Sequence, residues 1–286
     1  MKKVLLIFVI FAFNCSLYSD STFTVKKTKP KKTTVWQDLG NDLKYFAVDW
    51  GAYLTCPLRM DGKDLIISSS VIAGTVLSST VDKDFRNAVS RRGFDTYNGD
   101  FWDAPTAYGF VQYPSILGGA LYTIGLFARE HEIRKTGRML IQALAYSGTL
   151  TIGLRYLFGR HRPFTSERNQ YEFSWLNTSG DTQAFPSGHI VVAVATSTIL
   201  AEQIDTWWAR VILYGFAGLT GYARLYNDKH WLSDIIFGAA LGYGSAKFVL
   251  NREREREMKE KRKLRKKGGG FSFHPSLNGV SVSYNF

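Results

Sequence analysis

The sequence predicts an all-α protein: a six-helix bundle embedded in a membrane, followed by a short C-terminal β-hairpin. The first observation is a set of apolar segments, each close to the length that spans a membrane. Gly and Ala are frequent in them, as in closely packed membrane helices. The chain is also 45% hydrophobic, which is enough to bury a sizeable core. The six segments cover residues 64–81, 108–127, 138–158, 190–204, 211–226 and 233–250.

A soluble bundle of the same six helices is the alternative. Several segments are short or contain Ser, Thr, Gln or Arg, and segment 64–81 is the most polar of them. The mean hydropathy of the whole chain is slightly negative. The sequence therefore favours the membrane-embedded bundle and leaves the soluble bundle open.

The first 19 residues have the pattern of a bacterial signal peptide. Lys2 and Lys3 form a charged start, and the apolar run up to Phe13 is too short to span a membrane comfortably. Small residues permit cleavage around Ser19. We therefore expect residues 1–19 to be removed and the protein to be exported.

Residues 20–63 are predicted to form a Lys-rich arm and an amphipathic helix. The lysines gather at 26–32, where they suit anionic lipid head groups. Apolar and aromatic residues then recur at helical spacing, with polar residues between them. A helix lying at a membrane interface and a helix packed on a soluble core both fit this stripe. The stripe consists of Trp36, Leu39, Leu43, Phe46, Trp50 and Tyr53.

Basic loops predict how the bundle is oriented in a bacterial membrane. The basic residues at 128–138 and after residue 250 are expected on the cytoplasmic side. Residues 159–189 and 224–234 then lie on the extracytoplasmic side. A cleaved signal peptide followed by six crossings would instead leave the tail outside. Two arrangements remove this conflict: segment 64–81 does not cross fully, or the protein is peripheral and crosses nowhere.

The net charge of +12 comes in large part from a basic tail at 251–270, which is expected to be a solvated helix. Neither aromatic interleaving nor a nucleic-acid-binding module accompanies this tail, so no nucleic-acid partner is expected. Residues 271–286 carry two alternating runs around Pro275 and Gly279, which predict the hairpin. One hairpin cannot close a barrel, so a mobile or docked tail is expected.

Three polar clusters interrupt the apolar segments, all at helix ends on the same predicted side. The first lies at 155–163, the second at 186–189 and the third at 224–234. Their convergence is the main indication of a functional site. It is expected whether segment 64–81 does not cross the membrane fully or the protein is peripheral. The candidate residues in them are Arg155, Arg160, His161, Arg162, Ser187, Gly188, His189, Arg224, His230 and Asp234.

These residue types suit phosphoryl transfer. His230 and Asp234 are four residues apart, so on a helix the carboxylate would face the imidazole, fix its tautomer and leave the other ring nitrogen to attack. Ser187 and Gly188 open an apolar helix whose N-terminal N–H groups favour an anion. The arginines can bind phosphate oxygens, and His189 can protonate a leaving oxygen. The set predicts a phosphohistidine intermediate without a metal.

In this order the clusters resemble the signature of the type 2 phosphatidic acid phosphatase (PAP2) superfamily, which also contains class A acid phosphatases and vanadium haloperoxidases. The family pattern is K-x6-R-P, then P-S-G-H, then S-R-x5-H-x3-D. The resemblance covers residues 64–250, which are taken as the catalytic core. The matching stretches are Arg155-x6-Arg162-Pro163, Pro186-Ser187-Gly188-His189 and Ala223-Arg224-x5-His230-x3-Asp234.

The resemblance implies a role for each matching residue. His230 would be the nucleophile and Asp234 its orienting partner. His189 would be the general acid and then the base for the hydrolytic water. The phosphate would be bound by Arg155, Arg162, Ser187, Gly188 and Arg224.

Two positions depart from the family pattern. Arg155 replaces a lysine, which keeps the charge and changes its geometry. Ala223 replaces a serine and removes a hydroxyl. Neither change touches the two histidines, so activity is still expected, with altered phosphate contacts. Arg160 and His161 fall outside the pattern and are expected at the surface or at the rim of the substrate site.

We therefore expect a PAP2-type phosphatase in the bacterial cell envelope, with an extracytoplasmic active site and no cofactor. Its expected partners are the membrane and a phosphorylated lipid: phosphatidate, a polyprenyl pyrophosphate or lipid A. The apolar segments and the interfacial helix are the reasons for preferring a lipid. The alternatives are a soluble periplasmic acid phosphatase, a vanadate-dependent haloperoxidase on the same site, and a non-catalytic envelope protein.

Overall fold

The computed structural model describes residues 33–90, 103–165, 169–268, 270–276 and 279–285. The expected signal peptide and the lysine cluster lie outside these residues. The described part of the chain contains nine α-helices and two short 3-10 helices, Cys56–Arg59 and Gly180–Thr182. The α-helices are α2 (Val35–Leu54), α3 (Gly62–Thr80), α4 (Asp82–Val89), α5 (Asp103–Tyr108), α6 (Gln112–Phe127), α7 (His131–Phe158), α8 (Gly188–Ile204), α9 (Trp207–Tyr226) and α10 (Leu232–Gly268).

Each of the six predicted apolar segments is helical. They correspond to α3, α6, α7, α8, α9 and the first half of α10. The described residues also contain α2, which falls within the predicted amphipathic segment 20–63, and α4 and α5, which were not expected. Val81 separates α3 from α4, and the two helices meet at an angle of 60°.

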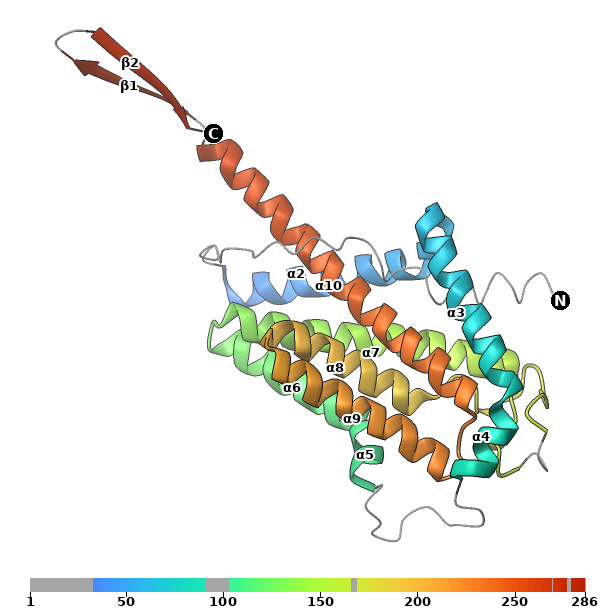
Figure 1. The fold of residues 1–286 in the computed structure, drawn as a ribbon. Helices are drawn as coiled ribbons and strands as arrows, with labels where there is room; N and C mark the ends of the chain where they lie inside the picture. Colours follow the sequence, from blue (N-terminus) through green and yellow to red (C-terminus); the bar gives the residue numbers. More distant parts are fainter. Residues whose placement is uncertain (1–32, 91–102, 166–168, 269, 277–278, 286) are drawn as a thin grey trace.

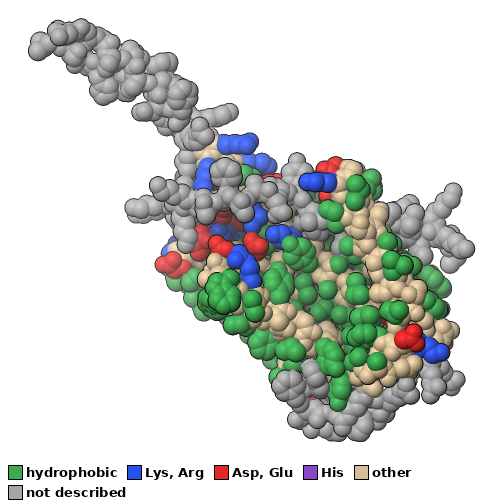
Figure 2. Space-filling model, viewed as in Figure 1, with side chains coloured by type: hydrophobic (Ala, Val, Ile, Leu, Met, Phe, Trp, Pro, Cys, Tyr) green, Lys and Arg blue, Asp and Glu red, His purple; other side chains and the backbone are tan. Residues whose placement is uncertain are grey.

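Among the described residues, no single helix is both long and apolar enough to cross a membrane. The bent pair formed by α3 and α4 has the required length and composition only when the two helices are taken together, and α8 is apolar but shorter. Large apolar side chains are still exposed, and Figure 2 shows hydrophobic side chains gathered over the face in view. Such a surface marks contact with a membrane or a partner. The exposed apolar residues of the described chain include Val76, Leu77, Ile116, Ile124, Trp207 and Val211.

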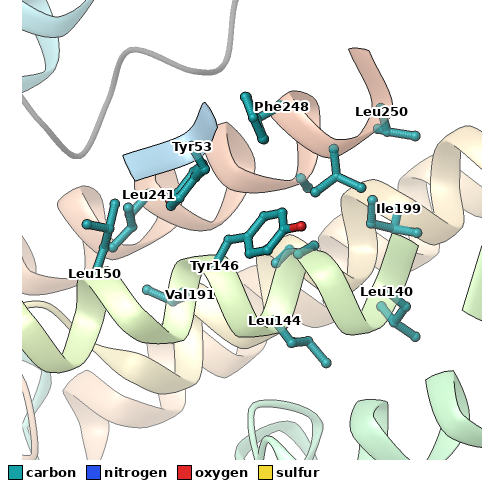
Figure 3. Packing of buried hydrophobic residues seen from close by; sticks show 14 of the residues in the cluster. Tyr53, Leu140, Leu144, Tyr146, Leu150, Val191, Ile199, Leu241, Phe248 and Leu250 are labelled. Carbon is teal, nitrogen blue, oxygen red and sulfur yellow. The ribbon is translucent and has the colours of Figure 1, made fainter. Parts of the chain in front are cut away.

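The centre of the bundle is formed by α7, α8 and α10, with α6 packed on α7 and α9 packed on α8 (Figure 1). Tyr146 of α7, Ile199 of α8 and Leu241 of α10 are fully buried and lie in one cluster (Figure 3). Burying an aliphatic side chain of this size contributes about 1.5–3 kcal/mol. This core fixes α8 and α10 against α7, and so fixes the helix ends that carry the three polar clusters.

Two glycines allow α10 to approach the start of α8. A Cβ atom on Gly238 would lie 2.6 Å from Cγ2 of Ile190 and 2.9 Å from the carbonyl oxygen of Ser187. A Cβ atom on Gly242 would collide with the backbone of Val191. Glycine is therefore needed at both positions. The close approach brings the first turn of α10 against the second polar cluster.

α2 buries its acidic face and exposes much of its aromatic stripe. Asp38, Asp42 and Asp49 are 8%, 6% and 1% exposed, whereas Trp36 and Leu43 are 78% and 62% exposed. Buried carboxylates require charged partners, and a helix that turns its acids inward must turn the opposite face outward. The predicted stripe is therefore divided: Tyr53 is buried in the core and Phe46 packs against it, whereas Trp36 and Leu43 face outward.

Arginines of α7 and α10 bind the acidic face of α2. Nε of Arg138 lies 3.0 Å from Oδ1 of Asp42. Nε of Arg252 donates to Oδ1 of Asp49 at 2.9 Å, and Arg256 pairs with the same carboxylate. These ion pairs, rather than apolar contacts alone, attach α2 to the two long helices.

α10 continues well past residue 250, where the predicted core ends. The chain from Arg252 to Glu257 is docked, because Glu253 pairs with Arg138 of α7 at 2.9 Å and Glu257 pairs with Lys135 at the same distance. The start of the predicted solvated tail is thus part of the bundle. Its later turns extend beyond the other helices in Figure 1.

Two strands follow α10. β1 (Gly270–Ser276) and β2 (Gly279–Asn285) pair antiparallel, with Phe271 opposite Tyr284 and Pro275 opposite Val280. Figure 1 shows the pair beyond the end of α10.

Candidate active site

The three polar clusters meet at one end of the bundle, where α7 and α9 end and α8 and α10 begin (Figure 1). Nε of Arg155 donates to the carbonyl oxygen of Pro186 at 3.0 Å, which joins the first cluster to the second. The backbone N–H of Ser187 donates to the carbonyl oxygen of Asp234 at 3.2 Å, which joins the second to the third. Segments far apart in the sequence therefore form one site.

His230 lies in the turn between α9 and α10. The spacing to Asp234 predicts that both residues are on one helix, but α10 begins only at Leu232. Nδ1 of His230 is 2.8 Å from the carbonyl oxygen of Ala184 and 3.7 Å from Oδ2 of Asp234. Because a carbonyl oxygen can only accept, Nδ1 carries the proton, and Nε2 of the neutral ring keeps its lone pair.

Asp234 is fully buried in the first turn of α10. Its Oδ1 accepts a hydrogen bond from Nη1 of Arg160 at 2.5 Å, and its Oδ2 accepts one from the backbone N–H of Trp231 at 2.8 Å. The carboxylate of Asp234 is therefore a nearby negative charge for the imidazole of His230. The group that directly orients the ring is the carbonyl of Ala184, which differs from the predicted arrangement.

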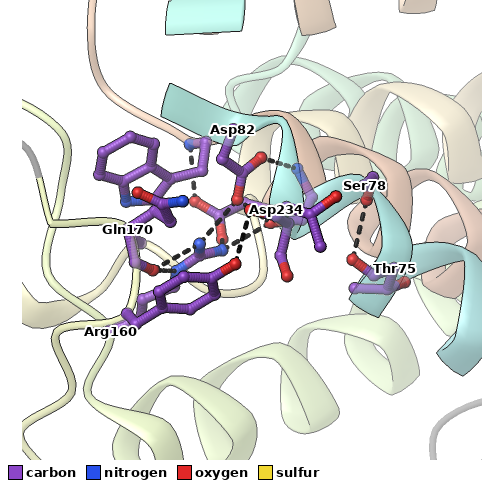
Figure 4. A network of polar contacts seen from close by, with 12 residues as sticks. Thr75, Ser78, Asp82, Arg160, Gln170 and Asp234 are labelled. Carbon is purple, nitrogen blue, oxygen red and sulfur yellow. Dashed lines mark hydrogen bonds and ion pairs between the residues drawn. The ribbon is translucent and has the colours of Figure 1, made fainter. Parts of the chain in front are cut away.

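The sequence prediction for Arg160 is wrong. It was expected at the surface or rim, but it is 3% exposed and lies between Asp82 and Asp234 (Figure 4). Its Nη2 donates to Oδ2 of Asp82 at 2.8 Å, and its Nη1 donates to Oγ of Ser233 at 2.7 Å as well as to Asp234. A guanidinium has enough donors in a fixed plane to hold both carboxylates. Arg160 is therefore a positioning residue. His161 is partly exposed, with Nε2 2.8 Å from a serine hydroxyl.

α4 supplies partners that the sequence analysis did not identify. Asp82 is its first residue, and its Oδ1 accepts the backbone N–H of Ser233 at 2.9 Å. Arg86 donates two hydrogen bonds to Asp228, at 2.7 and 2.5 Å, in the same turn as His230. No motif spacing connects these positions across the sequence. The only available signal was a short charged run directly after an apolar segment.

Buried polar atoms surround the start of α8. Nε2 of His189 and Oγ of Ser187 are buried, and neither has a hydrogen-bond partner in the described part of the chain. Burial, together with the charge of Arg224, holds the pKa of His189 well below its usual value. Unsatisfied buried polar groups are costly in the absence of a ligand. They therefore mark a place where an anion would bind.

Three arginines place positive charge around His230. Burial, followed by the charges of Arg162, Arg224 and Arg155, lowers the pKa of His230 well below its usual value. Nη2 of Arg155 lies against Gly188, where a Cβ atom would be 2.8 Å from it. Nε of Arg162 is anchored to a backbone carbonyl at 3.0 Å. Guanidinium groups held beside a helix N-terminus suit a phosphate or another oxyanion.

The donors of the site favour an oxyanion over a resident cation. Within the described ranges, no cluster of three or more His, Cys, Asp or Glu side chains could hold a metal ion. Asp234, the acid nearest to His230, is already paired with Arg160. A vanadate ion would meet the same positive charges as a phosphate.

Binding of an anion is expected to be coupled to proton uptake by His189. Sulfate placed beside the arginines adds negative charge near an imidazole whose pKa is low, so the pKa rises and the ring takes up protons as sulfate binds. By linkage, sulfate then binds more tightly as the pH falls from 7 to 5. Titration calorimetry in two buffers of different ionisation enthalpy measures the uptake, because sulfate itself does not titrate there. Uptake that is unchanged in His189→Gln would contradict this assignment.

A family model described as the PAP2 superfamily matches residues 137–257, a range that contains all three polar clusters. Residues 137–257 belong to the PAP2 superfamily. The family resemblance seen in the sequence is thereby confirmed. α2, α3 and α4 precede the matched range, so the PAP2 match does not include Asp82 and Arg86 of α4.

Two curated relatives are phosphatases that are named for lipid substrates. The chain is similar to the lipid A 1-phosphatase of Porphyromonas gingivalis, with 31% identity over 209 residues that cover 71% of this chain and 41% of that protein. It is also similar to the undecaprenyl-diphosphatase of Sulfolobus acidocaldarius, with 29% identity over 110 residues that cover 38% of this chain and 51% of that protein. The chain thus matches 41% and 51% of the lengths of these relatives.

A solved structure shares the PAP2 fold. It is the crystal structure of a transmembrane PAP2-type phosphatidylglycerolphosphate phosphatase from Bacillus subtilis. The TM-score is 0.50 and the identity is 16%, and the superposition covers 65% of this chain and 96% of that chain. At this identity the likeness shows the fold alone.

Proposed function

We propose that this protein is a phosphatase that hydrolyses a phosphate monoester or a pyrophosphate of a membrane lipid through a phosphohistidine at His230. The observation that carries the proposal is the environment of this ring. Its Nδ1 is bound to the carbonyl of Ala184 at 2.8 Å, and the charges of Arg162, Arg224 and Arg155 act on it. This combination leaves an uncharged, nucleophilic Nε2 in a positively charged site.

In the first step, the phosphate is held by Arg155, Arg162 and Arg224, by the hydroxyl of Ser187 and by the N–H groups at Gly188. The lone pair on Nε2 of His230 attacks phosphorus. The bond from phosphorus to the leaving oxygen breaks, its electron pair stays on that oxygen, and His189 supplies a proton to it. The arginines stabilise the charge on the equatorial oxygens.

In the second step, the now neutral His189 removes a proton from a water molecule. The water oxygen attacks phosphorus, and the bond to Nε2 of His230 breaks with its electrons returning to the ring. Inorganic phosphate leaves and His230 is restored. Asp234 and Arg160 take no part in bond making; they position the turn that holds His230.

The low pKa of His189 in the free protein is compatible with its role as an acid. Burial is the largest cause of that low pKa, and the charges of Arg224, Arg155 and Arg162 add to it. A bound phosphate offsets these charges, so the substrate itself raises the pKa of the ring that must protonate the leaving group. Protonation and substrate binding are therefore coupled.

A lipid is the favoured substrate class. The two curated relatives are named for lipid A and for undecaprenyl diphosphate. Apolar side chains are exposed on several helices of this chain, which suits a site reached from a membrane. Phosphatidate, a polyprenyl pyrophosphate and lipid A are the candidates.

The proposal places the protein in the bacterial envelope with its site on the extracytoplasmic side. The basic loop at 128–138 and the basic end of α10 support this orientation. The outward apolar side chains Trp36 and Leu43 support α2 as a helix lying in the membrane interface. A soluble periplasmic acid phosphatase would be released from membranes by carbonate washing, and the proposed protein would stay bound.

Release of inorganic phosphate by the full-length protein in detergent and EDTA tests the function. The substrates are phosphatidate, a polyprenyl pyrophosphate, lipid A and a soluble aryl phosphate. Release from at least one lipid, with a kcat/KM above that for the aryl phosphate, is the expected result. Release from the aryl phosphate alone would support the acid-phosphatase alternative. No release from any substrate by folded protein would contradict the proposed function.

A further inference from the structure

An apolar groove lies beside the active site, between α8, α9 and α10. Its volume is about 320 Å³, and aliphatic residues, glycines and tyrosines line it. Its apolar lining distinguishes it from the phosphate site, which is lined with arginine and histidine. The residues used in the argument are Ile190, Val194, Gly218, Gly221, Leu225 and Ile235.

The groove begins at the catalytic motifs. Ile190 directly follows His189, Leu225 directly follows Arg224, and Ile235 directly follows Asp234. α8, α9 and α10 thus each carry a polar residue of the catalytic motifs and, directly after it, a residue of the groove.

The groove then runs along α9, away from the site. Its lining on this helix extends from Leu225 back to Tyr214. These residues are separated by about 16 Å along a helix with a rise of about 1.5 Å per residue. A group bound at the phosphate site and a chain lying in the groove would therefore be continuous.

Glycines of α9 form the floor and the opening of the groove. At Gly221 a Cβ atom would lie 3.1 Å from Cγ2 of Ile235 and 3.3 Å from Cδ1 of Ile190, so the groove is narrow there. At Gly218 a Cβ atom would meet no described atom within 4 Å, so the groove is open. Further along α9, before Tyr214, Val211 and Ile212 expose apolar side chains. A hydrocarbon chain could thus leave the groove without crossing a polar surface.

We propose that this groove holds one hydrocarbon chain of the substrate and thereby selects lipid phosphates over water-soluble ones. The inference rests on the proposed phosphatase function and adds the site that recognises the apolar part of the substrate. Each methylene group buried in such a groove strengthens binding by about fourfold. Apolar contacts made before the reaction begins mainly lower KM and leave the chemical step unchanged.

Gly218→Leu fills the groove, and Gly215→Leu is its matched control. Both glycines lie in α9, and a Cβ atom on either one meets nothing within 4 Å among the described atoms. Leucine favours a helix more than glycine does, so neither change weakens α9. Gly215 does not line the groove.

The test compares kcat/KM for a long-chain phosphatidate in mixed micelles with kcat/KM for a soluble aryl phosphate. Gly218→Leu is expected to lower the lipid value by about tenfold or more, through KM, and to leave the aryl value unchanged. Gly215→Leu is expected to match the wild type on both. Lipid turnover at the wild-type rate in Gly218→Leu would overturn the groove assignment, and so would an equal loss on both substrates. Failure of the phosphatase function itself would be seen separately, as absent turnover in the wild type.

Discussion

Replacement of His230 by glutamine is expected to lower kcat by at least about 10⁴-fold on every substrate that the protein turns over, because removing a nucleophile removes the covalent pathway. Glutamine keeps a polar side chain of similar reach and cannot form the phosphoryl intermediate. Steady-state release of inorganic phosphate measures the effect.

The matched control for this change is His161→Gln. His161 belongs to the same cluster region but is partly exposed and hydrogen-bonded to a serine hydroxyl at 2.8 Å. Its replacement is expected to change kcat by less than about threefold, since surface substitutions of this kind alter few interactions. A His230→Gln protein that is folded and keeps a tenth or more of the wild-type kcat would contradict the assignment of the nucleophile.

Removal of Arg160 is expected to cost about 3–5 kcal/mol of unfolding free energy, the range for breaking a buried ion pair. Arg160→Leu leaves the carboxylates of Asp82 and Asp234, which both pair with this guanidinium, buried without it. The turn that holds His230 should loosen as a result. Denaturant unfolding of the protein in detergent measures the loss of stability.

Arg210→Leu is the control for an exposed ion pair. Arg210 lies 2.5 Å from Asp205, but its side chain is 42% exposed. Exposed pairs contribute about 1 kcal/mol or less, so this variant is expected to unfold close to the wild type. Equal losses in the two variants would show that Arg160 is not the centre of a buried network.

Local sequence patterns predicted the helices well, because a helix depends on the composition of a short stretch of chain. The length of the apolar runs placed all six segments in helices, and Arg155 and His189 lie at helix ends as expected. The prediction failed where it required the exact residue at which a helix begins. His230 lies outside α10 because the helix starts two residues later, at Leu232.

The long-range partners could not be predicted in the same way. Arg160 contacts Asp82 across 78 residues, and the carbonyl that orients His230 belongs to Ala184, 46 residues away. Every residue type has a backbone carbonyl, so the sequence does not indicate which carbonyl will orient a side chain. The acidic face of α2 was also missed, because an inward row of Asp residues looks like an ordinary solvated face until its arginine partners are known.

Trapping the phosphohistidine tests the central claim most directly. The His189→Gln variant should form the intermediate from a substrate with a good leaving group and release it slowly, since the base for the water is missing. After rapid alkaline quenching, peptide mass spectrometry should find a phosphoryl group on His230 that is stable to alkali and lost in acid. A phosphoryl group on Ser187, or turnover with no phosphorylated peptide at any time, would contradict the account.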